Sequence, residues 1–207
     1  MNRRVSLFLV VAGLLLSACA NPATNQPKAT TSEAAPVKQQ AAAGEKYSIT
    51  PANSKVEFTG SKVTGSHSGS FQRFTGSIDY AGQPEKSVVK VTIEMNSVTT
   101  EEADLTKHLQ TPDFFDVQKF PEASFVSTEI KPGGEKGATH TVTGNLTLHG
   151  VTKAITFPAT ISVAPGVVNV DSSFAINRKD FGIVYAGAAN NLIRDEVVLA
   201  LHVKATK

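Results

Sequence analysis

Apolar and polar residues alternate with a period of two over most of the chain from Tyr47 onward. Such alternation is typical of β-strands that bury one face and expose the other to water. The clearest strands are expected at residues 89–95, 142–148, 155–163, 168–176 and 197–203. Proline- and glycine-containing turns fall between alternating segments, at residues 81–84, 131–134 and 164–166. The pattern therefore predicts an antiparallel, all-β domain.

Two places interrupt the alternation. Residues 99–109 combine the spacing of a capping box with two leucines four residues apart, which predicts one short helix that Pro112 ends. Phe71 and Phe74 lie three residues apart, so we expect a bulge or bend between them. The domain is thus a run of strands with a single inserted helix.

About eight or nine strands can close into a barrel or pack as a sandwich. Several reach about ten residues, or about 33 Å, and closure removes unpaired edge strands. We therefore favour a lipocalin-like antiparallel barrel of about eight strands. We call the buried, apolar face of each strand its dry face. Small residues on the dry faces, such as Gly60, Gly76 and Gly144, either leave an internal apolar cavity or let the strands bend at barrel corners. The two interpretations have equal support from these residues.

The N-terminus has the pattern of an export signal. Two arginines precede an apolar run, residues 5–16, that is too short to span about 30 Å of hydrocarbon. The following Leu-Ser-Ala-Cys sequence resembles the lipobox, after which lipoprotein signal peptidase leaves an acylated Cys19. Residues 18–20 also fit ordinary signal peptidase, which would release a soluble protein. We favour the lipobox because Cys19 is the only cysteine, which also excludes an intrachain disulfide.

The segment after the cysteine has almost no large apolar side chain. Residues 20–45 are mostly Ala, Pro, Thr, Gln and Lys, and this composition predicts a disordered tether with a reach of about 25–30 Å. We therefore divide the chain into a signal peptide (1–18), an acylated cysteine with its tether (19–45) and one barrel domain (46–207).

Charge indicates little about partners. Of 20 basic residues, two lie in the signal, which leaves 18 against 18 acidic residues. A neutral mature chain favours neither nucleic acid nor an anionic membrane surface by electrostatics. Ala20 stands where an aspartate would retain a lipoprotein at the inner membrane of enteric-type bacteria. In a Gram-negative host we therefore expect the periplasmic side of the outer membrane.

Four ordered motifs in the domain resemble those of the YceI-like family. They lie at residues 108–115 with 119–125, 143–153, 177–183 and 194–197. The resemblance covers about residues 46–206. It implies a barrel with a long internal pore that holds a polyisoprenoid or similar chain, in proteins that are typically periplasmic and non-enzymatic. The lipid anchor departs from many relatives, which are soluble secreted proteins.

The dry-face residues are the candidates for the cavity lining. They are Phe58, Phe74, Ile78, Val91, Ile93, Leu146, Leu148, Phe157, Phe174 and Leu199, with Phe114 and Phe115 guarding the mouth. Each can instead be ordinary core. The expected ligand is a polyprenyl carrier or an isoprenoid quinone, and a fatty acid or fatty amide satisfies the same cavity. The alternative is a filled barrel that binds a protein partner on its outer wall.

No catalytic or metal-binding constellation stands out in the sequence. The five histidines (67, 108, 140, 149 and 202) lack metal-ligand spacing. Asp113 and Asp116 flank two phenylalanines without a facing carboxylate. Ion pairing at a barrel rim is favoured over a ligand headgroup site for four charged residues, Arg178, Asp180, Arg194 and Asp195. We therefore expect no enzyme, no cofactor and no metal, and the oligomeric state stays open.

Overall fold

The computed structural model describes residues 21–37 and 44–207. In these ranges the only α-helix is α1 (Ala103–Leu109). The strands are β1 (Thr30–Glu33), β2 (Glu45–Ile49), β3 (Lys55–Lys62), β4 (Gly65–Phe71), β5 (Phe74–Tyr80), β6 (Val88–Glu94), β7 (Val98–Thr100), β8 (Glu122–Pro132), β9 (His140–Leu148), β10 (Val151–Ala164), β11 (Val167–Asn177), β12 (Gly187–Ala188), β13 (Asn191–Leu192) and β14 (Glu196–Thr206).

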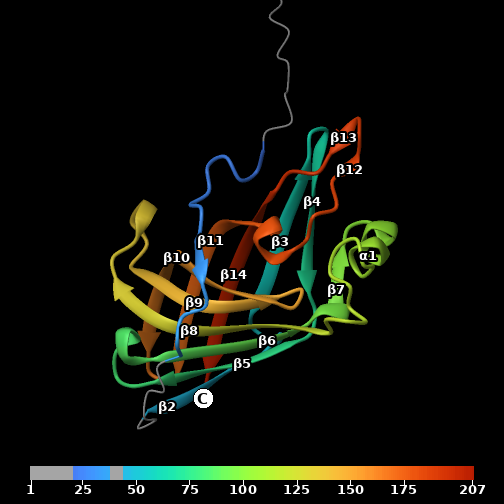
Figure 1. The fold of residues 1–207 in the computed structure, drawn as a ribbon. Coiled ribbons are helices and arrows are strands. Elements are labelled where there is room, and N and C mark those ends of the chain that lie inside the picture. Colours follow the sequence, from blue (N-terminus) through green and yellow to red (C-terminus); the bar gives the residue numbers. More distant parts are fainter. Residues whose placement is uncertain (1–20, 38–43) are drawn as a thin grey trace, which may run out of the picture.

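Eight of these strands close a barrel (Figure 1). The order is β10-β9-β8-β6-β5-β2-β14-β11, and β11 returns to β10. All of these pairs are antiparallel. A second part of the sheet leaves the barrel, because β3 also pairs with β14 and is followed sideways by β4 and β7. The predicted antiparallel barrel of about eight strands with one short helix is confirmed.

The predicted strands and the predicted helix have their expected places. The five clearest alternating runs correspond to β6, β9, β10, β11 and β14. The chain bends between Phe71 and Phe74, where β4 ends and β5 begins. The prediction of a capping box is wrong, because the N-cap residue is Glu102 and no side-chain hydrogen bond caps the helix there. Instead, the Thr106 hydroxyl accepts the N–H of Thr100 at 2.9 Å.

Residues 21–37 lie against the barrel wall, and we call them the N-terminal strap. The prediction of a disordered tether is wrong for this stretch. Ala23 is 1% exposed and packs on Ala175 and Val198. The N–H of Ala29 donates to the carbonyl of Ala175, which lies in β11, and the N–H of Ala175 donates to the carbonyl of Pro27, both at 2.8 Å. Further along, β1 pairs with residues 153–156 of β10.

The strap fills a gap in the barrel wall. β10 and β11 pair with each other only where residues 160–164 face 167–171. Beyond that, the strap hydrogen-bonds to both strands, and Ala29 packs against the core cluster that includes Ile155 and Phe174. Backbone pairing with an otherwise unpaired strand edge stabilises a segment whose one large apolar side chain, Val37, is exposed. Composition alone therefore could not predict this contact.

Substitution of Ala23 by Asp should detach the beginning of the strap, because it places a carboxylate at a site that is 1% exposed. We expect the amides of Ala29 and Ala175 to exchange with solvent about 10–100-fold faster, as an unpartnered buried polar group costs about 1–3 kcal/mol. Hydrogen exchange measures this, and Thr24→Asp at the exposed neighbouring position is the control. Equal protection in both variants would contradict the docked strap.

Candidate ligand cavity

The barrel encloses a cavity of about 250 Å³. The surface that faces this space is apolar throughout. Val197 and Val203 of β14 both line it, so the cavity extends along about 20 Å of that strand at about 3.3 Å per residue. The interior therefore contains a cavity and is not a completely filled core.

All twelve residues predicted to line a cavity lie in its wall. They are Phe58, Phe74, Ile78, Val91, Ile93, Phe114, Phe115, Leu146, Leu148, Phe157, Phe174 and Leu199. Their contact with a ligand stays a prediction. Other lining residues continue the same alternation and could have been found from it, such as Val56, Val142, Leu201 and Val203. Ile183 and Ile193 lie in a loop without periodicity, so no sequence pattern indicates them.

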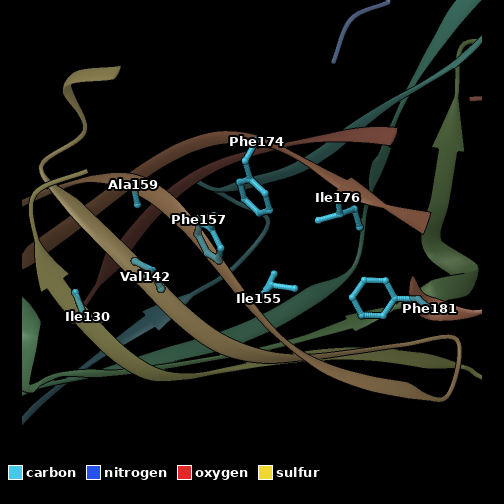
Figure 2. Close-up of a cluster of buried hydrophobic side chains, with 8 residues drawn as sticks. All are labelled: Ile130, Val142, Ile155, Phe157, Ala159, Phe174, Ile176 and Phe181. Atoms are coloured by element: carbon cyan, nitrogen blue, oxygen red, sulfur yellow. The ribbon is translucent and has the colours of Figure 1, made fainter. Parts of the chain in front are cut away.

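Buried side chains from β8 to β11 form one wall of the cavity (Figure 2). Phe157 and Phe174 stack with ring centroids 4.2 Å apart and an interplanar angle of 10°. In Figure 2, Ile130 and Val142 lie toward one end of the cluster and Phe181 toward the other. Phe181 is completely buried. This wall is well packed behind the cavity, which gives it a fixed shape.

The two phenylalanines expected at a mouth form an aromatic cover after α1. Phe115 packs on Phe58 and Phe71, with ring centroids 6.4 and 5.9 Å away. Phe114 is 8% exposed and packs edge-on against His108 and Tyr185. On the outer side, Nε2 of His108 lies 2.8 Å from Oδ2 of Asp113. Asp113 is thus paired with a histidine rather than simply solvated.

The dry-face glycines have different surroundings. Gly60 lines the cavity, and a Cβ built on it meets nothing within 4 Å. A Cβ at Gly144 would lie 2.3 Å from Cζ of Phe125, and one at Gly76 would lie 2.5 Å from the carbonyl oxygen of Lys90. The cavity interpretation therefore holds for Gly60. Gly144 and Gly76 instead allow close approach of neighbouring groups.

Arg178 is the charged residue in the cavity wall, but its guanidinium hydrogen-bonds to the loop of residues 182–195 and not to the cavity. Nη1 donates to the carbonyl of Ile183 at 2.7 Å, and Nε donates to that of Arg194 at 3.1 Å. Nη2 lies 3.4 Å from both the Ile193 carbonyl and Oδ1 of Asp195. Burial lowers the pKa of Arg178, and the charge of Asp195 partly opposes this shift. Arg178 thus clamps the loop of residues 182–195 across one end of the barrel.

The predicted ion pairing at the rim is present for two of the four charged residues. Asp195 pairs with Arg178 and, at 2.9 Å, with Nζ of Lys179. Nε of Arg194 is buried without a hydrogen-bond partner among the described residues, where Arg194 and Asp180 form no ion pair. Since no polar atom faces the cavity, a headgroup site inside it gains no support.

The described part of the chain, residues 21–37 and 44–207, offers no cluster suited to a metal ion. No group of three or more His, Cys, Asp or Glu side chains in these ranges can hold one. Four of the histidines instead lie beside carboxylates, of which the nearest are those of Glu101, Asp113, Glu85 and Asp171. No helix in the same ranges is long and apolar enough to cross a membrane.

Replacing Arg178 by Met should release the loop that it clamps. The carbonyls of Ile183, Ile193 and Arg194 lose their donor, and we expect the free energy of unfolding to fall by about 1–3 kcal/mol. Arg178→Lys should recover little, because one ammonium cannot reproduce the planar fork. Urea denaturation measures the loss, with half-exposed Lys179→Met as the control. If Arg178→Met were as stable as the control, the clamp would have no energetic role.

Comparison with known proteins agrees with this geometry. The model of the YceI-like domain matches residues 47–205. A UPF0312 protein of Pseudomonas putida is 39% identical over 133 residues, which are 60% of this chain and 68% of the relative. BcnA of Burkholderia cenocepacia has the same fold, with a TM-score of 0.65 and 24% identity over 76% of this chain and 99% of its own. A polyisoprenoid-binding domain of Saccharophagus degradans gives a TM-score of 0.62 and 19% identity over 77% and 97%. The chain belongs to the YceI-like family.

Proposed function

We propose that this protein binds the apolar chain of a polyisoprenoid or an isoprenoid quinone inside its barrel. The observation that carries the proposal is the wholly apolar cavity along about 20 Å of β14. Water in such a space finds no hydrogen-bond partners, and an empty space deprives the lining side chains of contacts. An isoprenoid chain needs no hydrogen bonds and restores the contacts of the lining side chains, so it avoids both unfavourable situations. The polyisoprenoid-binding domain of S. degradans, which shares the fold, supports this choice of ligand.

Burial of the chain supplies the affinity. At about 0.8 kcal/mol per methylene-sized group, each five-carbon isoprene unit contributes about 3–4 kcal/mol before ordering costs. A polar headgroup inside the cavity would lose its hydrogen bonds, because no polar atom faces it there. The headgroup therefore stays outside the apolar space. A fatty acid or fatty amide satisfies the same physics, and sequestration, transport and storage all follow from reversible binding.

The proposed site of action is the cell envelope. Cys19 lies outside the described residues, and its acylation is supported by the lipobox and by its being the sole cysteine. In a Gram-negative host, the anchored protein would face the periplasm from the outer membrane. The mass of the mature N-terminal peptide tests the anchor: acyl chains on Cys19 are expected, and a mature chain that lacks Cys19 would contradict it.

Filling the cavity should displace the ligand without harming the fold. Gly60→Leu adds four carbons where a Cβ meets open space, so we expect a polyprenyl alcohol to bind about 100-fold more weakly, equivalent to about 3 kcal/mol. Fluorescence titration of the delipidated full chain measures the affinity. Gly65→Leu is the matched control, because Gly65 is also open around its Cβ position but does not line the cavity.

Native mass spectrometry of protein purified from its own host identifies what the barrel carries. A prenyl lipid or a quinone is the expected companion. Recovery of a fatty acid or amide would instead establish the alternative ligand. A barrel that carries no lipid and has no affinity for prenyl alcohols, quinones or fatty acids would overturn the proposed function.

A further inference from the structure

Two hairpin segments project together from the barrel. The N–H of Val63, at the β3–β4 turn, donates to the carbonyl of Leu192 at 3.1 Å. Lys62 and Ile193 form an antiparallel bridge beside it. We call residues 62–65 and 184–193 the apolar arm. In Figure 1 it includes β12 and β13 at the upper right, next to the ends of β3 and β4.

Exposed apolar side chains are concentrated on this arm. Val63 is 48% exposed, Leu192 49% and Val184 64%. Only two other large apolar residues in the described ranges are exposed, Val37 and Val163. Single exposed apolar residues are ordinary, but a cluster of them marks an interaction surface. Three of the five exposed large apolar residues of the described ranges belong to the arm, where a hydrogen bond joins Val63 to Leu192. This concentration identifies the arm as a docking surface.

The charges around the arm favour a membrane surface as its partner. No acidic residue lies between Asp180 and Asp195, nor between Glu57 and Asp79. Lys62 lies within the arm, bridged to Ile193, whereas the Nε of the following Arg194 is buried. Further along β4, Glu101 and Glu102 lie beside His67. Apolar tips beside basic residues bind the interface of membranes that contain anionic lipids, where each cation contributes about 1 kcal/mol. The mature chain is neutral as a whole, so this basic character is local.

The N-terminal strap begins close to the base of the arm. Ala23 packs on Val198, which pairs with Thr59 of β3. From Thr59 to Val63 is four residues, or about 13 Å of strand. Cys19 precedes Ala23 by four residues, so at most about 14 Å of chain separates them. A lipid on Cys19 and the tip of the arm can therefore reach the same surface.

We propose that the apolar arm is a membrane-docking surface, which inserts Val63, Val184 and Leu192 into the interface of the bilayer that holds the acylated Cys19. The inference rests on the anchor in the proposed function. Ile193 belongs to the arm and Gly60 lies in β3, two residues before it, and both line the cavity. Docking therefore places this end of the cavity next to the membrane, where an insoluble chain enters or leaves.

The test uses the full acylated chain, with its N-terminal mass verified, in vesicles of phosphatidylethanolamine and phosphatidylglycerol. Val63→Cys and Leu192→Cys carry an environment-sensitive fluorophore. Val163→Cys is the matched control, because Val163 is 40% exposed and pairs with Val168, near the opposite end of β14. We expect blue-shifted emission and at least about threefold weaker iodide quenching for the two arm labels only. Equal quenching of all three labels would overturn the proposal.

Two further measurements separate membrane docking from self-association and from ligand loading. Shielding of the arm that appears without vesicles and increases with protein concentration would assign the arm to a second copy of the chain, and would overturn membrane docking. The lipid content of the barrel is measured in the same samples. If the barrel is empty while the arm labels are shielded, the proposed ligand fails and the docking surface stands. If the barrel is loaded while the arm labels are quenched, only the docking surface fails.

Discussion

β11 hydrogen-bonds to β10 along one edge and to β14 along the other, and this double pairing turns the sheet into a barrel. Once the sheet closes, the dry faces of its strands point at one another across a common interior. Large side chains such as Phe157 and Phe174 fill part of that interior, and the remainder is the cavity. The apolar cavity is therefore a consequence of closure, because no strand could form it alone.

The N-terminal strap binds where β10 and β11 meet to close the barrel. β10 and β11 share only part of their length, and the strap pairs with the edges that remain. This contact changes the expected geometry of the anchor. A free tether of about 26 residues would reach about 25–30 Å. With Ala23 docked on Val198, only residues 20–22 lie between this contact and Cys19 in the sequence. The anchor would then hold the barrel in a restricted orientation.

The end of the barrel near that anchor is built differently from its walls. The loop of residues 182–195 crosses it, held by Arg178 through three backbone carbonyls. The same loop supplies Leu192 to the apolar arm and Ile193 to the cavity wall. One segment thus links the proposed membrane contact to the proposed ligand space.

Alternation was sufficient to predict the main strands and the ten lining residues that lie in strands, because closure turns their buried faces inward; Phe114 and Phe115 lie in a turn and were indicated by their aromatic side chains instead. It failed where other interactions decide the structure. Backbone pairing fixes the strap, the Phe125 ring occupies the space at Gly144, and hydrogen bonds from Arg178 position Ile183. Occupation of the barrel by an apolar chain can be tested with intermolecular nuclear Overhauser effects between a bound polyprenyl alcohol and the methyl groups of Leu146 and Leu199. We expect such effects at both residues, and effects confined to outward-facing methyl groups, such as that of Thr141 beside the cavity-lining Val142, would contradict it.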